Sequence, residues 1–96
     1  MNTICIEIIK DLACFIAFGY GYGIGSDHLV DYIEFSEWTS IDLHISEVRT
    51  AYEWLVANGY IYEYASDPHS DSPYYYNIGL TKKAWGYIEA NGIEID

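Results

Sequence analysis

Apolar residues repeat with the period of an α-helix in four segments of the chain, and with the period of a β-strand in two. The clearest helical segment follows Ser46, which is a suitable N-cap. Its apolar residues recur at i, i+3, i+4, i+7 and i+8, and they are Val48, Ala51, Tyr52, Leu55 and Val56. Asn58-Gly59 then predicts a left-handed cap that ends this helix.

The first segment predicts a helix from Thr3 to about Phe18. Its apolar arc is wider than one core contact needs, so we expect part of it to meet a second subunit or the last helix of the same chain. A second helix is predicted over 27–35, with Ser26 or Asp27 as its cap. The expected buried side of that helix consists of Leu29, Val30 and Ile33, with Tyr32 as a further candidate.

The last helix is predicted to begin after Thr81 and to close at Asn91-Gly92. Before it, residues 60–64 and 74–80 predict two strands of a hairpin whose tip is the polar stretch 65–73. The connection 36–45 shows no clear period, and its apolar residues are expected to anchor to the core: Trp38, Ile41, Leu43 and Ile45. The glycine-rich run 19–26 follows a helix and is not followed by lysine, so it predicts a turn and not a phosphate-binding loop.

These elements predict one domain over 1–96, mainly α with a small β-hairpin, in which 1–25 form the N-terminal helix and glycine-rich turn and 26–96 form the core. No apolar run approaches the roughly 18 residues of a membrane span, so we expect no membrane insertion. Cys5 and Cys14 fall near opposite faces of the first helix, which argues against a disulfide between them. Two packed thiols indicate a reducing compartment, and we expect a cytoplasmic location.

The net charge of the chain bears most strongly on which class of partner to expect. Fifteen acidic residues face four basic ones, which gives a formal net charge of −11. Nucleic-acid binding draws its affinity from neutralising phosphates with Lys and Arg, and only Lys10, Arg49, Lys82 and Lys83 are present. The charge therefore argues against nucleic acid as a partner and favours a partner with a basic surface.

The order of the elements, with AYEWLVANGYIYEY and YYYNIGLTKKAWGYI, resembles a winged helix-turn-helix domain. AYEWLVANGYIYEY is similar to a recognition helix that leads into the first wing strand. YYYNIGLTKKAWGYI is similar to the other wing strand and the closing helix of MarR-type and PadR-type regulators. This resemblance covers roughly residues 26–91 and implies a winged helix-turn-helix fold with an added N-terminal helix, which in those families often builds a dimer interface. It also implies a third helix that reads base edges and a wing that touches the DNA backbone.

The residues at those positions depart from what DNA reading requires. Helical geometry turns Thr50, Glu53 and Trp54 outward, with Glu47 beside them, so the third helix presents carboxylates and an indole. The candidate partner-binding residues lie on this face and on the hairpin: Glu47, Thr50, Glu53, Trp54, Tyr64, Asp67, Asp71 and Tyr74. The acids would supply the electrostatic field, and the aromatic residues would supply buried contact area.

A structural explanation stands beside this functional one. An acidic surface also keeps a protein soluble. Tyrosines commonly pack in the core with their hydroxyls at the surface, and five are assigned to the core on this basis: Tyr52, Tyr60, Tyr62, Tyr75 and Tyr87.

No catalytic motif was found, so we expect no enzymatic activity and no cofactor. The D-x-H-x-D spacing of 67–71 offers metal ligands on a single loop, which seldom makes a closed site, so no metal is expected.

The leading hypothesis is an acidic winged-helix protein that inhibits or regulates a basic nucleic-acid-handling protein, such as a host defence nuclease or a polymerase, as a mimic of DNA or RNA. In size and charge it resembles the anti-CRISPR and anti-restriction inhibitors of phages and mobile elements, which would place it in the host cell cytoplasm. The alternative is a homodimeric winged-helix transcription regulator that dimerises through the first and last helices and contacts phosphates with Arg49, Lys82 and Lys83. A third hypothesis is an assembly or adaptor role within a larger complex.

Overall fold

A computed structural model of the chain describes residues 1–39, 41–65, 69 and 76–95. Helices and a small antiparallel sheet follow one another in the order α1 (Thr3–Cys14), η1 (Phe15–Gly19), β1 (Val30–Asp31), α2 (Tyr32–Thr39), α3 (Ser46–Ala57), β2 (Ile61–Ala65), β3 (Tyr76–Leu80) and α4 (Lys82–Ala90). The prediction of a mainly helical chain with a small hairpin is thereby confirmed. None of the helices within the described ranges is long and apolar enough to cross a membrane.

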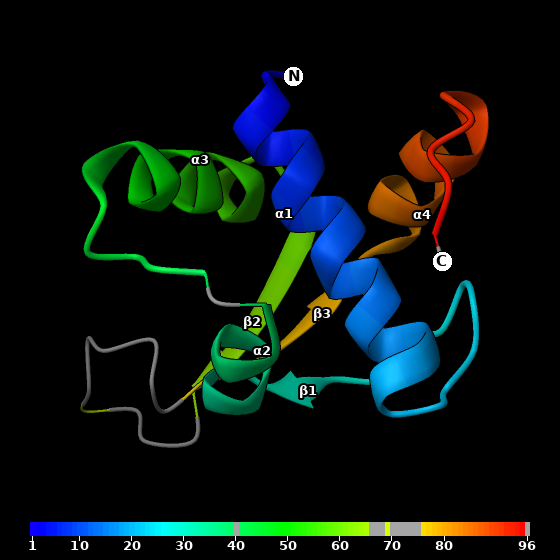
Figure 1. The fold of residues 1–96 in the computed structure, drawn as a ribbon, viewed down its shortest axis with the longest axis horizontal. Coiled ribbons are helices and arrows are strands. Elements are labelled where there is room, and N and C mark those ends of the chain that lie inside the picture. The colour runs from blue at the N-terminus through cyan, green and yellow to red at the C-terminus, as the bar shows by residue number, and fades with distance from the viewer. Residues whose placement is uncertain (40, 66–68, 70–75, 96) are drawn as a thin grey trace.

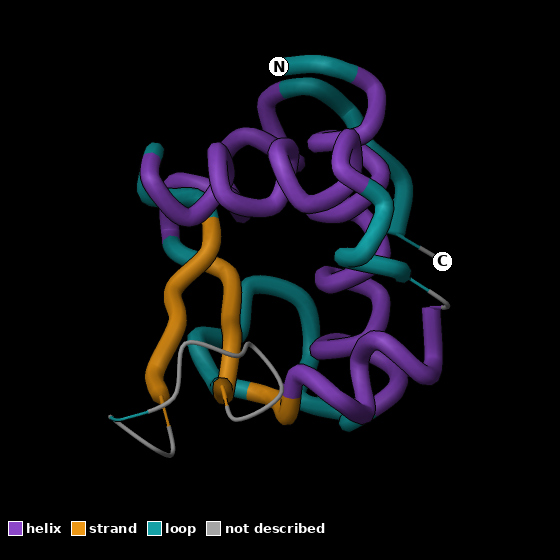
Figure 2. The backbone as a smooth tube through the Cα atoms, turned by 90° about the vertical axis from the view of Figure 1, so that its left-hand side faces the viewer, coloured by secondary structure: helices purple, strands orange, loops and turns teal. Residues whose placement is uncertain are grey.

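The sheet has the strand order β1-β3-β2, and both of its strand pairs are antiparallel. In the hairpin Ile61 pairs with Leu80 and Glu63 pairs with Ile78, while Val30 of β1 lies on the other side of Ile78. Figure 1 shows α1 running diagonally across the sheet, with α3 on one side of it and α4 on the other. Figure 2 shows β2 and β3 side by side at one edge of the molecule, with the helices beside and above them.

The core is built around α1. Ile9 and Leu12 of α1 and Ile16 of η1, which continues it, are completely buried, and they share one apolar cluster with Leu55 of α3 and Ile78 of β3. The wide apolar arc of the first helix is therefore used within the chain, since α1 packs against α3, β3 and α4. We expected this arc to meet either a second subunit or the last helix of the same chain, and α4 is the one of these two that the structure contains.

Local side chains explain where several helices begin and end. The Asn2 side chain accepts a hydrogen bond from the backbone N–H of Cys5 (2.8 Å), and the Thr81 side chain accepts one from the N–H of Ala84 (3.2 Å). Gly59 ends α3 at φ 79°, a left-handed conformation that glycine adopts without strain. The predicted cap at Thr81 and the predicted stop at Gly59 are both confirmed.

The second helix begins five residues later than its sequence pattern predicts, because Val30 and Asp31 pair with β3 as strand β1. The carboxylate of Asp31 accepts a hydrogen bond from the N–H of Glu34 (3.1 Å) and so caps α2 from outside the helix. The helix then continues to Thr39 and buries Phe35, whereas Ile33, which was expected in the core, is exposed.

Two further expectations from the sequence are wrong in detail. Ile45, and not Ser46, occupies the N-cap position of α3, and no side chain caps this helix. The turn before it explains the shift, because the Asp42 side chain accepts from the N–H of His44 (2.8 Å) and the Asp42 carbonyl accepts from the N–H of Ile45 (3.2 Å). Trp38 and Ile45, expected as core anchors, are both 52% exposed, while Leu43 is buried as predicted.

Replacing Thr81 with alanine should destabilise the fold by about 1–2 kcal/mol, the usual cost of a lost helix cap. The hydroxyl also donates to the carbonyl of Gly59 (2.6 Å), so the substitution loosens the turn after α3 as well. Urea unfolding measures the change. Thr50→Ala, at an exposed site inside α3, is the matched control and should change stability by less than about 0.5 kcal/mol. Equal losses in the two variants would contradict the assigned cap.

Tyr20 predicts a sensitivity to alkaline pH. Desolvation, followed by the hydrogen bond that its hydroxyl donates to Glu34, raises the pKa of Tyr20 to about 12. The unfolded chain loses this proton near the ordinary value of 10.0, so the folded state binds more protons in between and its stability falls as pH rises from 10.0 toward 12. Tyr20→Phe should flatten this fall in urea unfolding measured at stepwise increasing pH. Tyr22→Phe, at an exposed neighbouring site, should leave the slope unchanged.

Candidate functional site

The outward face of α3 is the first part of the candidate site. Ala51, Tyr52 and Leu55 are buried, and the side chains between them point away from the core. The predicted outward residues Glu47, Thr50, Glu53 and Trp54 are all exposed, which confirms the orientation of the helix. Their role in binding a partner stays a prediction.

Trp54 is exposed but held in place. Its ring stacks on the ring of Tyr60, with centroids 5.8 Å apart and an angle of 17° between the planes. Lys83 lies over the same tyrosine, 4.4 Å from the ring centroid, and donates a hydrogen bond to the carbonyl of Asn58 (2.7 Å). The indole therefore presents 42% of its surface from a supported position, which suits a contact residue because little side-chain entropy remains to be lost on binding.

The charges on α3 partly compensate one another. The guanidinium of Arg49 donates to the carboxylate of Glu53 (3.0 Å) in an i, i+4 pair, with 49% and 62% of the two side chains exposed. Such an exposed pair contributes little stability, but it places a carboxylate next to the one cation of this helix. Lys83 is engaged at the other end of α3, where it bonds to Asn58. Asn58 lies nine positions after Arg49, which is roughly 13 Å along a helix. These two cations therefore do not form a continuous positive strip.

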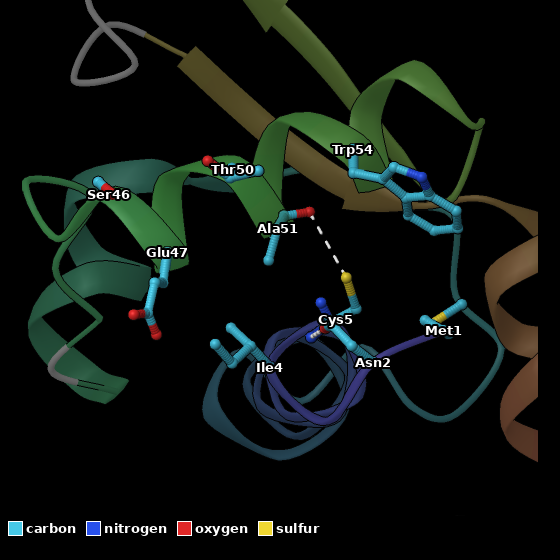
Figure 3. A pocket seen from close by; sticks show the side chains of 9 residues that line it. All are labelled: Met1, Asn2, Ile4, Cys5, Ser46, Glu47, Thr50, Ala51 and Trp54. Carbon is cyan, nitrogen blue, oxygen red and sulfur yellow. Dashed lines mark hydrogen bonds between the residues drawn. The ribbon is translucent and has the colours of Figure 1, made fainter.

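A hollow between the first turn of α1 and the outer side of α3 is the second part of the site. It has a volume of about 570 Å³. Glu47, Thr50, Ala51 and Trp54 line it from α3 together with Ser46, and its opposite wall consists of Met1, Asn2, Ile4 and Cys5. Figure 3 shows Glu47 and Trp54 at opposite ends of the hollow, with Ile4 and Ala51 between them.

The residues from the N-terminal segment were not among the predicted contacts. Their only signal in the sequence is the wide apolar arc of the first helix, and nothing in that pattern indicates that its first turn lies against α3.

The buried thiol of Cys5 joins the two helices below the hollow, because its sulfur donates to the carbonyl of Ala51 (3.8 Å). Burial raises the pKa of this thiol. Both cysteines are buried thiols that form no disulfide with each other, as predicted.

The hairpin contributes exposed tyrosines from one face of β2. Tyr64, a predicted contact residue, is 58% exposed, and Tyr62 on the same face is 53% exposed. The assignment of Tyr62 to the core is therefore wrong, since the alternation of β2 places it outward. Asp67, Asp71 and Tyr74 lie outside the described residues.

Glu63, on the opposite face of β2, has a structural partner. Its carboxylate accepts a hydrogen bond of 2.5 Å from the hydroxyl of Tyr52, and this bond ties α3 to the sheet. Burial, followed by this hydrogen bond, raises the pKa of Tyr52 well above its usual range. Tyr52 therefore belongs to the core, as expected, and Glu63 is not a free member of the acidic face.

Acidic residues concentrate in one stretch of the sequence. The stretch 31–63, which includes α2, α3 and β2, contains Asp31, Glu34, Glu37, Asp42, Glu47, Glu53 and Glu63 but only one base, Arg49. Seven acids and one base give this stretch a formal charge of −6, while the three lysines lie on other elements. Among the described residues no group of three or more His, Cys, Asp or Glu side chains is arranged to hold a metal ion.

Adjacent residues on α3 test which side faces solvent. Trp54→Ala should cost about 1 kcal/mol through the lost aromatic stacking, with an unchanged circular-dichroism spectrum. Leu55→Ala removes a completely buried side chain and should cost roughly 2–5 kcal/mol. Urea unfolding of the two variants gives the difference. A larger loss in the Trp54 variant would place the wrong face outward.

Comparison of the chain with protein-family models, with curated proteins and with solved structures gives no match.

Proposed function

We propose that the chain is an acidic winged-helix module that binds a basic nucleic-acid-handling protein and inhibits or regulates it as a stand-in for nucleic acid. The observation that carries this proposal is the chemistry of α3: Glu47, Glu53 and Trp54 are exposed where a DNA-reading helix needs basic side chains. The face combines a negative field with a supported aromatic anchor.

The order of the elements supports the winged-helix part of the proposal. An amphipathic helix, α3, is followed after the Gly59 turn by the hairpin β2-β3 and then by the closing helix α4. This is the order that a winged helix-turn-helix domain has. Fold alone does not assign a function, so the contact chemistry of the exposed face decides between partners.

Electrostatics favour a protein partner over nucleic acid. With a formal net charge of −11, and −6 of it within 31–63, the chain repels phosphates and accelerates its encounter with a positive groove. The alternative, a DNA-binding regulator, needs free cations near the wing. Of the three cations named for that role, Arg49 is paired with Glu53 and Lys83 bonds to the carbonyl of Asn58, which leaves the exposed Lys82 to contact phosphates by itself.

Charge reversal on α3 tests the proposal. Increasing amounts of the chain should inhibit DNA cleavage by a panel of purified basic nucleases, and Glu47→Lys combined with Glu53→Lys should raise the half-inhibitory concentration about tenfold. Glu89→Lys combined with Glu94→Lys makes the same change in net charge at and after α4 and should shift it less than threefold. Equal shifts would mean that only net charge matters. Nanomolar binding of duplex DNA by the unmodified chain, weakening steeply with salt, would overturn the proposal in favour of the regulator.

A further inference from the structure

The hollow between α1 and α3 combines three kinds of surface within one concavity of about 570 Å³. Ile4 and Ala51 form an apolar floor, Trp54 adds an aromatic wall at one end, and Glu47 adds a carboxylate at the other end. A side chain with an apolar part and a cationic head fits this combination, because the apolar part loses water and the head meets an opposite charge.

Glu47 is the one charged side chain among the residues that line the hollow. In the smaller hollow on the sheet side of α3, of about 240 Å³, both carboxylates are already engaged, Glu53 by Arg49 and Glu63 by the hydroxyl of Tyr52. A cation from outside would compete with an existing bond at either of these residues, so Glu47 is the better partner for it.

The walls of the hollow are fixed before any partner arrives. Tyr60 supports the ring of Trp54, and the Cys5 thiol bonds to the carbonyl of Ala51 beneath the floor. One wall belongs to α3 and the other to the first turn of α1 and the two residues before it, and the inner faces of both helices are in the core. A preformed groove binds without the cost of ordering its own side chains.

The spacing of the two ends defines the length of the occupant. Glu47 and Trp54 are seven residues apart on one helix, which is about 10.5 Å at 1.5 Å per residue. A segment in the extended polyproline II conformation has three residues per turn and rises about 3.1 Å per residue, so residues i and i+3 share one face about 9 Å apart. The side chains of residues i and i+3 of such a segment would thus reach the two ends together.

We propose that this hollow binds an extended segment of the basic partner, in which an apolar side chain packs on Trp54 and Ile4 and an arginine three residues away pairs with Glu47. The inference rests on the proposed function and names the feature of the partner that this surface recognises. Arginine fits better than lysine because its planar guanidinium can donate two hydrogen bonds to one carboxylate. A peptide fits better than a small molecule because Trp54 stays 42% exposed, whereas small-ligand pockets enclose most of their ligand.

A designed peptide tests this inference directly. The probe is acetyl-Leu-Gly-Gly-Arg-Gly-Gly-Leu-amide, which offers the required spacing in both chain directions, added to the full-length ¹⁵N-labelled protein. Amide shifts are expected within 1–5 and 46–54 and at the indole N–H of Trp54. Glu47→Gln should weaken binding about fivefold, the factor that corresponds to one partly exposed ion pair. Glu94→Gln, with the same loss of charge outside the hollow, should leave it within a factor of two.

Control peptides separate this inference from simple charge attraction. Replacing the arginine of the probe with glutamate, or both leucines with glycine, should abolish the localised shifts. Equal binding of either control, shifts located elsewhere, or no effect of Glu47→Gln would overturn the inference.

If the charge-reversed α3 variant loses nuclease inhibition while Glu47→Gln and Trp54→Ala retain it, the hollow is not the contact site and the proposed function stands. If the peptide binds as expected and no basic protein is inhibited, the proposed function falls and the peptide site remains.

Discussion

The burial of α1 across the sheet is the constraint on which the rest of the structure depends. Ile9, Leu12 and Ile16 lie at the centre of one cluster that also includes side chains of α3 and β3. Because a single helix fills the space between α3 and α4, its first turn must lie beside the outer part of α3. The hollow beside Trp54 is a direct consequence of this packing, since it is the space that remains where the two helices diverge beyond their shared core.

The same packing separates the structural side of α3 from its exposed side. On the inner side Tyr52 is buried and donates to Glu63 of β2, so the helix is fixed to the sheet by a short hydrogen bond as well as by apolar contacts. On the outer side Trp54 is held by Tyr60 while much of its ring stays in water. Rigid support of an exposed aromatic residue and an excess of acidic over basic side chains are two independent properties of α3. Their combination on one helix is the reason for which we propose a protein partner in place of nucleic acid.

Much of the fold could be predicted from periodicity and cap chemistry. The apolar repeat of α3, the cap at Thr81 and the turn at Gly59 depend on residues close together in sequence, and the structure contains all three. The start of α2 could not be predicted, because Val30 and Asp31 become a strand only by pairing with β3, more than forty residues later. Likewise, the exposure of Tyr62 depends on which face of the hairpin meets the helices. The alternation in β2 places Tyr62 and Tyr64 on one face and Ile61, Glu63 and Ala65 on the other, but it does not decide which face is covered.

For the candidate site, the sequence alone determined the acidic charge and the outward direction of Glu47, Thr50, Glu53 and Trp54. Both follow from composition and from the 3.6-residue period of a single helix. Only the tertiary structure decided that Met1, Asn2, Ile4 and Cys5 lie opposite these residues, that Arg49 is paired and that Glu63 is engaged by Tyr52. The physical reason is that a helical period specifies which side of a helix is apolar, while the choice of the element that covers it depends on how all the apolar surfaces of the chain are buried together.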